Sequence, residues 1–531
     1  MKNIRIIITN LLAVLSLGLF AQNGSYKLEF DSQKYKKQTL EYRGQKFNIR
    51  AFEGIVYVAN PVDTVYHKMN IYIPEAYFQG NSINGYSSET APVFFPNQIG
   101  GYMPATPAST QNTGFGNERP MNNRANRDRR EGRPRSDRPR TGNRDGQFRH
   151  ADNRPSMMET AQKENTVIAA LSKGYVVASA GARGRTNKDG NGRFYGKAPA
   201  AIVDLKAAVR YLKYNDKAMP GDANKIISNG TSAGGAMSAL LGATGNNPDY
   251  QQYLDELGAA NGSDAIFATS AYCPITNLDN ADMAYEWQFN GIDHYRKGGM
   301  FASEGNNTEM NLTEQQTGVS TALKNMFPDY INSLQLKNLQ GDILTLDKDG
   351  NGSFKTLVKS YVIASANKAL KEGTDISQYK WIVIQNNVVT DLDWDAYIRY
   401  MERQKTPPAF DALDLSSGEN NLFGTDIIDN QHFTEYGQQN TTTSASRADK
   451  HIVKLMNPMY YIGTPDSETA KYWRIRHGSK DKDTGLAISA ILATYLQNRG
   501  YQVDYALPWD KPHSGDYDLD ELFQWIDSIS R

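Results

Sequence analysis

The chain has 531 residues and balances 58 lysines and arginines against 58 aspartates and glutamates. A formal net charge of zero excludes the strong overall field that is typical of proteins that bind nucleic acid or acidic membranes. The only cysteine, Cys273, excludes an intramolecular disulfide, so a large hydrophobic core must hold the fold together.

The first residues are typical of a secretory signal peptide. Lys2 and Arg5 precede an apolar run from Ile6 to Phe20. A run of ~15 apolar residues is short for a membrane span, which needs about 20. We therefore expect residues 1–21 to be removed and the protein to be exported, either periplasmic or secreted, with no membrane span.

Apolar, β-branched segments recur along the chain and alternate with helical patterns. The predicted strands are Met69–Ile73, Val93–Phe95, Tyr175–Ala180, Lys225–Ser228, Ile266–Ala271, Trp473–His477 and Tyr501–Leu507. The predicted helices are Ala198–Tyr214, Thr484–Arg499 and Leu519–Ile529. This alternation indicates an α/β fold with a mostly parallel sheet and helices on both faces. Alternation before Pro92 predicts an antiparallel start to the sheet.

Two segments interrupt this plan. Residues 105–156 are rich in arginine and nearly without aliphatic side chains, so they cannot bury enough apolar area to offset the entropy of ordering. We expect a disordered insertion there, with nucleic-acid or glycan binding as the alternative. Residues 277–470 mix helix and loop and are expected to form an inserted lid that sets specificity. The α/β core would then comprise residues 22–276 and 471–531.

The segment Gly230-Thr-Ser232-Ala-Gly234 lies between a short apolar strand and a helix rich in alanine and leucine. This is the G-x-S-x-G nucleophile elbow of the α/β-hydrolase fold, in the strand–turn–helix context that supports it. Glycines flank the serine because a Cβ there would collide with the neighbouring strand and helix. Ser232 is therefore the expected nucleophile, and an ordinary glycine-rich turn is the alternative.

A serine hydroxyl needs a histidine to take its proton and a carboxylate to orient that histidine. His513 follows the last predicted strand in a polar turn, where this fold places its base. His477 is predicted to lie within a strand and to be structural. Asp481 and Asp483 both follow the penultimate strand, and the residues alone do not decide which is the orienting acid.

The oxyanion formed during ester cleavage needs two backbone amides. The amide of Ala233, at the start of the helix, should supply one. The other should come from the glycine-rich loop after an early strand, at Gly100 and Gly101, although a plain glycine turn is the alternative. Cys273 is predicted to be a small buried apolar residue, with a cysteine nucleophile as the minor alternative.

Several motifs together resemble the bacterial tannases, the tannin acyl hydrolases, of the subtype (B) with a Gly-Thr-Ser-Ala-Gly-Gly elbow. Besides the elbow, the resemblance includes Gly-Gly-Tyr-Met-Pro (100–104), Gly-Ala-Arg-Gly-Arg (181–185), Lys-Ala-Pro-Ala-Ala-Ile-Val-Asp-Leu-Lys (197–206), Tyr-Cys-Pro-Ile-Thr (272–276), Lys-Thr-Pro-Pro-Ala-Phe-Asp (405–411) and the block from Asp481 to His513. It covers nearly all of the mature chain except the arginine-rich insertion, which departs from the family pattern.

The resemblance implies a triad of Ser232, Asp481 and His513. It also implies that Lys405, Glu419 and Asp483 recognise the three hydroxyls of a galloyl ring. Charged groups suit this task because vicinal phenols both donate and accept hydrogen bonds, and a ring without hydroxyls would leave those charges unpaired.

The sequence therefore predicts an exported serine esterase that cleaves galloyl esters and needs neither a cofactor nor a metal. Its partner would be a small phenolic ester rather than nucleic acid. The alternatives are an esterase for feruloyl or other phenolic esters on the same scaffold and, less favoured, a catalytically silent binding protein with a hydrolase fold.

Overall fold

The computed structural model describes residues 25–111, 164–297 and 308–531. The predicted signal peptide and residues 112–156 of the predicted insertion lie outside these ranges. Residues 105–111, at the start of the predicted insertion, lie within the described ranges. Ala105 pairs with Ala182, and the Ala108 amide donates to Ser179 Oγ at 2.9 Å. These small side chains pack against a buried strand, so local composition underestimated the order here.

A nine-stranded sheet forms the centre of the molecule, in the order β1-β2-β3-β5-β4-β6-β7-β12-β13. Its strands are β1 (Lys36–Tyr42), β2 (Gln45–Val56), β3 (Lys68–Pro74), β4 (Pro92–Pro96), β5 (Val176–Ala180), β6 (Asp222–Thr231), β7 (Ala268–Tyr272), β12 (Tyr472–Arg476) and β13 (Gln502–Ala506). In this order the neighbouring pairs of β1-β2-β3-β5 are antiparallel, and the remaining pairs, β5-β4-β6-β7-β12-β13, are parallel. The predicted strands and the antiparallel start are confirmed.

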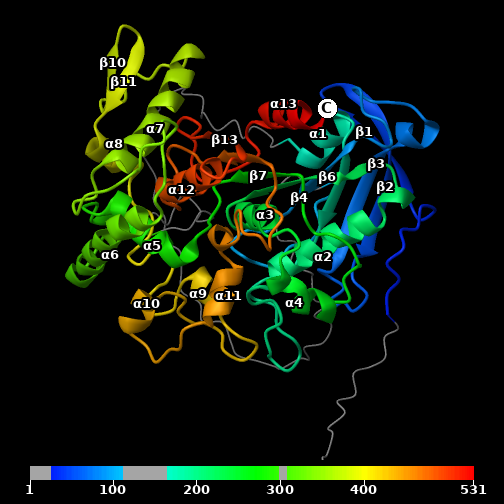
Figure 1. Ribbon diagram of the computed structural model, residues 1–531, viewed down its shortest axis with the longest axis horizontal. Coiled ribbons are helices and arrows are strands. Elements are labelled where there is room, and N and C mark those ends of the chain that lie inside the picture. Colours follow the sequence, from blue (N-terminus) through cyan, green and yellow to red (C-terminus); the bar gives the residue numbers. More distant parts are fainter. Residues whose placement is uncertain (1–24, 112–163, 298–307) are drawn as a thin grey trace, which may run out of the picture.

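Helices cover both faces of this sheet. They are α1 (Thr166–Ser172), α2 (Ala200–Tyr214), α3 (Ala233–Ala243), α4 (Gln251–Glu256), α12 (Leu486–Gln497) and α13 (Leu519–Ser530). In Figure 1, α1 and α13 lie on one side of the central strands and α2 and α3 on the other. Every residue of β4, β5 and β7 is buried, as expected for strands covered on both faces. The architecture is the α/β-hydrolase fold predicted from the sequence.

The segment between β7 and β12 adds a mostly helical layer beside the sheet (Figure 1). Its elements are α5 (Leu278–Phe289), β8 (His294–Lys297), β9 (Thr308–Asn311), α6 (Glu314–Ser333), α7 (Ser353–Lys371), β10 (Ile382–Gln385), β11 (Val388–Leu392), α8 (Trp394–Met401), α9 (Gly418–Leu422), α10 (Glu435–Gln439) and α11 (Lys450–Leu455). Its treatment as a separate lid domain stays a prediction.

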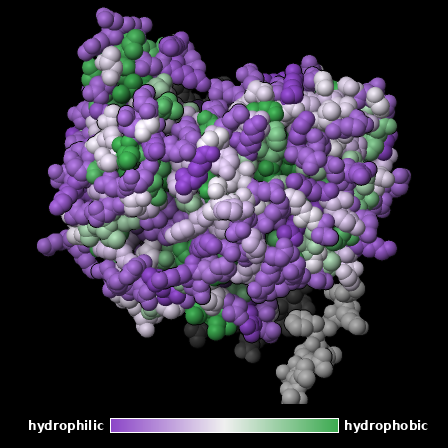
Figure 2. Space-filling model, viewed as in Figure 1, coloured by the Kyte–Doolittle hydropathy of each residue, from purple (hydrophilic) through white to green (hydrophobic). Residues whose placement is uncertain are grey.

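The face in Figure 2 is mostly hydrophilic. Apolar side chains gather on the hairpin β10–β11, at the top left, where Val383, Ile384 and Val388 are exposed. Among the residues that the structure describes, no helix has both the length and the apolar character to span a bilayer.

The chain turns sharply from β6 into α3 at Ser232. Ser232 has φ 62° and ψ −123°, in the region that side-chain-bearing residues rarely adopt. A Cβ on Gly230 would lie 2.3 Å from the Gly234 carbonyl oxygen, and a Cβ on Gly234 would lie 2.7 Å from the Ile99 carbonyl oxygen. Only glycines at these two positions let the strand and the helix approach closely enough to hold Ser232 in this conformation.

Gly230→Ala should therefore lower the free energy of unfolding by roughly 3 kcal/mol, because the clash is with backbone that cannot move aside. Urea denaturation measures the change. Gly318→Ala is the matched control, since Gly318 is exposed in α6 with nothing within 4 Å of an added Cβ. This control should gain about 0.5–1 kcal/mol of helix propensity. Equal stability of Gly230→Ala and the unmodified protein would show that the turn can open.

Candidate active site

Ser232 lies at the carboxyl edge of the sheet, between the loops that follow β4 and β7. Its amide donates to the Tyr272 carbonyl at 2.9 Å. The Asn97 side chain, from the loop after β4, donates to the carbonyls of Asn229 and Gly234 at 3.2 and 3.0 Å. These bonds clamp the turn from both neighbouring strands. The serine is therefore held by backbone contacts rather than by its own side chain, and it is only partly buried.

Asp481 and His513 form a buried pair beside this edge. His513 Nδ1 lies 2.7 Å from Asp481 Oδ2, and Asp481 Oδ1 accepts the amide of Asp483 at 2.9 Å. Asp483, the other candidate acid, approaches the opposite nitrogen of the ring, with 3.8 Å between its Oδ2 and His513 Nε2. Asp481 and Asp483 therefore face opposite nitrogens of the His513 ring, a difference that the sequence alone did not predict.

The electrostatics of the pair follow from this contact. Burial alone would raise the pKa of Asp481, but His513 and His477 lower it well below its usual range. Burial alone would lower the pKa of His513, but the Asp481 carboxylate raises it well above 6.5. The charged form of each partner is thus stabilised by the other.

His513 differs from two other buried histidines that face an aspartate, His67 and His432, in its unpartnered ring nitrogen. His67 uses both nitrogens, on Asp204 and on the Val62 amide. His432 also uses both, on Asp411 and Thr441. His513 Nε2, in contrast, is buried with no hydrogen-bond partner among the described residues. Of these three rings, only His513 keeps a nitrogen that could take a proton from a bound nucleophile.

The sequence predicts a structural role within a strand for His477, and the structure adds a contact with Asp481. It directly follows β12, with Nδ1 2.8 Å from Ser489 Oγ and Nε2 3.3 Å from Asp481 Oδ2. Asp481 is therefore flanked by two imidazoles. Sequence reasoning missed this contact because the four-residue spacing between His477 and Asp481 spans a loop, where spacing does not predict direction.

The expected oxyanion-hole positions lie on the two segments that meet at Ser232. Ala233 begins α3, where the first amides have no helical acceptor. The carbonyls of Gly100 and Gly101 accept from the Met103 amide at 3.0 Å and from Arg185 Nε at 2.8 Å. These bonds fix the peptide planes of the loop. Donation of these amides to an oxyanion stays a prediction.

Cys273 follows β7 and is fully buried, as predicted, but it adjoins the acid–base pair. Ligand atoms of Cys273, Asp481 and His513 all lie within 4.8 Å of one another. Asp481 and His513 already satisfy each other through a hydrogen bond, so this group does not make an open metal site. Burial raises the pKa of the Cys273 thiol. A protonated thiol is a weak nucleophile, which favours Ser232 over the cysteine alternative.

The structure brings the predicted ring-binding residues together. Lys405 Nζ lies 3.2 Å from Asp483 Oδ2, and it also lies over the Phe410 ring at 4.1 Å. Burial raises the pKa of Glu419, while the charge of Lys405 lowers it and that of Asp483 raises it. Asp483 therefore links the three predicted residues to His513: it contacts Lys405 and approaches His513 Nε2, and its charge and that of Lys405 act on Glu419 in α9.

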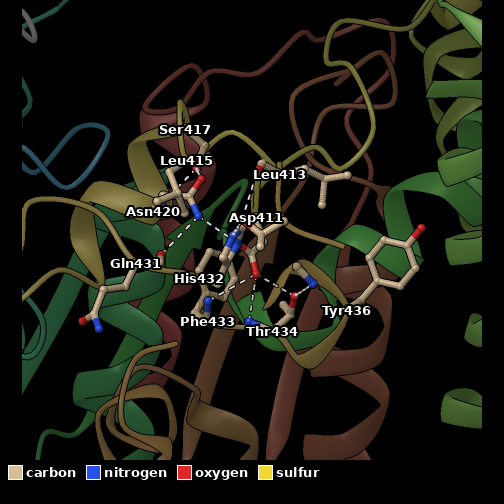
Figure 3. A network of polar contacts seen from close by, with 12 residues as sticks. Asp411, Leu413, Leu415, Ser417, Asn420, Gln431, His432, Phe433, Thr434 and Tyr436 are labelled. Atoms are coloured by element: carbon tan, nitrogen blue, oxygen red, sulfur yellow. Dashed lines mark hydrogen bonds and ion pairs between the residues drawn. The ribbon is translucent and has the colours of Figure 1, made fainter. Parts of the chain in front are cut away.

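A buried polar network supports the helix that carries Glu419 (Figure 3). Asp411 is its centre and accepts bonds from Asn420 Nδ2, His432 Nδ1, the amides of Phe433 and Thr434, and the Thr434 hydroxyl. Asn420 follows Glu419 directly, and the Ser417 hydroxyl caps the same short helix through the Asn420 amide at 2.9 Å. The bond from Asn420 ties α9, which has little more than one turn, to a carboxylate that four further bonds hold to residues 432–434.

Comparisons with known proteins place the whole chain among ester hydrolases. A family model described as BD-FAE matches residues 150–311. The structure of a tannase from Fusobacterium nucleatum is 48% identical, covers 95% of this chain and 100% of its own, and has a TM-score of 0.83. A tannin acyl hydrolase from Lactobacillus plantarum is 43% identical, with 95% and 99% covered and a TM-score of 0.83.

Two further comparisons concern the ligand and the curated relatives. A tannin acyl hydrolase solved in complex with ethyl gallate is 43% identical, with 95% of this chain and 99% of that chain covered and a TM-score of 0.82. The esterase LipC from Mycobacterium tuberculosis is 43% identical over 68 residues, which are 13% of this chain and only 17% of that protein. Because the likeness to the solved tannases extends over their whole length, the chain belongs to the tannase family of ester hydrolases.

Proposed function

We propose that this protein is an exported serine esterase that hydrolyses galloyl esters to gallic acid and an alcohol through an acyl-enzyme. The observation that supports the proposal is the position of Asp483, which lies 3.8 Å from His513 Nε2 and 3.2 Å from Lys405 Nζ, with Glu419 close enough to be affected by both charges. The relative that binds ethyl gallate supports the same substrate class. Export rests on the sequence of residues 1–21 alone.

In the proposed first half-reaction, Ser232 Oγ attacks the ester carbonyl carbon while His513 Nε2 takes its proton. The negative charge that develops on the carbonyl oxygen is met by the Ala233 amide and by an amide of the loop at Gly100 and Gly101. The tetrahedral intermediate then expels the alcohol, which receives the proton from His513. The acyl group remains on Ser232 as an ester.

In the second half-reaction a water molecule replaces the alcohol. His513 takes a proton from the water, the resulting hydroxide attacks the acyl carbon, and the Ser232 oxygen leaves with that proton. Asp481 stabilises the imidazolium in both halves, which agrees with the raised pKa of His513. The free acid is released, and the starting state of the enzyme is restored.

Ring recognition follows from the charges. Glu419 and Asp483 can accept hydrogen bonds from phenolic hydroxyls, and Lys405 can donate one to a phenolic oxygen. A ring without hydroxyls would displace water from these groups and leave them without hydrogen-bond partners. The proposed site therefore selects against such rings more strongly than a purely apolar pocket could.

Ser232→Ala should lower turnover of methyl gallate by about 10³-fold or more, because the remaining site offers no nucleophile. His513→Ala should be similarly damaging. Steady-state kinetics and labelling by a fluorophosphonate probe measure the two effects, with circular dichroism to confirm folding. A folded Ser232→Ala protein that keeps full activity would exclude this nucleophile, and an unlabelled wild type would favour the silent binding protein.

The pH dependence of kcat/KM should have an acidic limb above pH 6.5, since the neutral imidazole is the base and Asp481 raises the pKa of His513 above that value. Activity is then lost as the pH falls through the raised pKa. Asp481→Asn removes the carboxylate, so the limb should move to lower pH while kcat falls by about 10⁴-fold. A limb below pH 6.5 that Asp481→Asn leaves in place would contradict this assignment.

The ring-binding residues should affect galloyl esters selectively. Lys405→Met, Glu419→Gln and Asp483→Asn should each reduce kcat/KM for methyl gallate by about tenfold or more, as expected for a lost hydrogen bond to a charged group. The small ester p-nitrophenyl acetate should be nearly unaffected and is the control substrate. Equal losses on both esters would argue against ring recognition. Faster turnover of methyl ferulate than of methyl gallate by the wild type would favour the feruloyl alternative.

A further inference from the structure

Two loops that are far apart in the sequence meet behind the proposed ring site. One carries Gln404 and Lys405, and the other carries Lys482 between the two acidic residues. The Tyr285 hydroxyl, from α5, joins them. It accepts the amides of Gln404 and Lys405 at 3.2 and 3.1 Å and donates to the Lys482 carbonyl at 2.8 Å.

This hydroxyl is used to its full capacity. A phenol has one proton to donate and two lone pairs to accept with, and Tyr285 spends all three on backbone groups of the two loops. The side chain is fully buried, and burial raises its pKa, so the proton stays in place to be donated. Its contacts therefore fix the backbone of both loops, which contacts with flexible side chains would not do.

The ring of Tyr285 reaches the same site by packing. It meets the Phe410 ring edge-on, with 6.1 Å between centroids, and the Lys405 ammonium lies over the Phe410 ring at 4.1 Å. A second bond between the loops, from Gln404 Nε2 to Asp483 Oδ1 at 3.0 Å, depends on the same loop register. The 3.2 Å contact between Lys405 and Asp483 is thus built on backbone that Tyr285 holds.

We propose that Tyr285 is a positioning residue for ring recognition, which presets the distance between Lys405 and Asp483 before the substrate arrives. This inference rests on the proposed galloyl esterase function. Tyr285 does not need to touch the substrate, because it acts through the two charged groups that do. A recognition pair that is held in place before binding loses less freedom when the ring binds.

Tyr285→Phe tests the proposal in the full mature chain, since it removes the hydroxyl and keeps the ring. The matched control is Tyr250→Phe, because Tyr250 is also fully buried and its hydroxyl also donates to a backbone carbonyl, that of Leu455. The readout is the ratio of kcat/KM for methyl gallate to that for p-nitrophenyl acetate, together with the melting temperature. Wild-type turnover of methyl gallate against methyl benzoate is measured first.

We expect Tyr285→Phe to lower the ratio by about tenfold or more, as for a small displacement of a binding group. Tyr250→Phe should keep the wild-type ratio even if its melting temperature falls as far. An unchanged ratio in Tyr285→Phe, or equal losses on both esters, overturns the proposal and leaves Tyr285 as a structural brace. A wild type that does not prefer methyl gallate over methyl benzoate overturns the proposed function, and this inference with it.

Discussion

The buried carboxylate of Asp481 organises the edge of the sheet where the site lies. A carboxylate with no exposure is tolerated only if hydrogen bonds or positive charge meet it on every side. Here the amides of Asp483 and Thr484 bond to one oxygen, and His513 and His477 face the other. The loop from 477 to 484 must fold around this group.

The fold of that loop has consequences beyond the acid itself. Because Asp481 binds the amide of Asp483, the Asp483 side chain is directed elsewhere, toward His513 Nε2 and Lys405. Lys482, between the two aspartates, is left with its carbonyl facing Tyr285. One buried charge thus fixes three consecutive residues that face different partners: Asp481 faces His513, the Lys482 carbonyl faces Tyr285, and Asp483 faces Lys405.

Local patterns in the sequence were sufficient for the parts of the fold that depend on local physics. The strands that become β3 to β7, β12 and β13 are apolar and β-branched, and the glycines around Ser232 reflect a clash that any side chain would cause. Local patterns do not distinguish Asp481 from Asp483 as the partner of His513. Two carboxylates two residues apart on a loop have no periodicity to fix their directions, so the residues could not decide between them.

The supporting contacts could not be predicted at all from the residues. The Tyr285 hydroxyl joins loops about 120 and 200 residues away along the chain, and no local pattern links the three segments. Asp411 and His432 likewise have no pattern that links them, and the network around Asp411 forms only when five groups converge. Such contacts join segments that are distant along the chain, so they follow from tertiary packing and leave no local sequence pattern.

At the proposed ring site, stability would be given up for recognition. Burial is the largest cause of the raised pKa of Glu419; the charge of Asp483 raises it further, while Lys405 and Arg185 lower it. A well-packed apolar pocket would be more stable, but it would reject an isosteric ring only weakly. Vicinal phenols supply the donors that these carboxylates lack. In the proposed function, a hydroxylated ring would therefore satisfy these buried charged groups better than an apolar ring, and we infer that supports such as Tyr285 hold the groups at fixed distances before the ring binds.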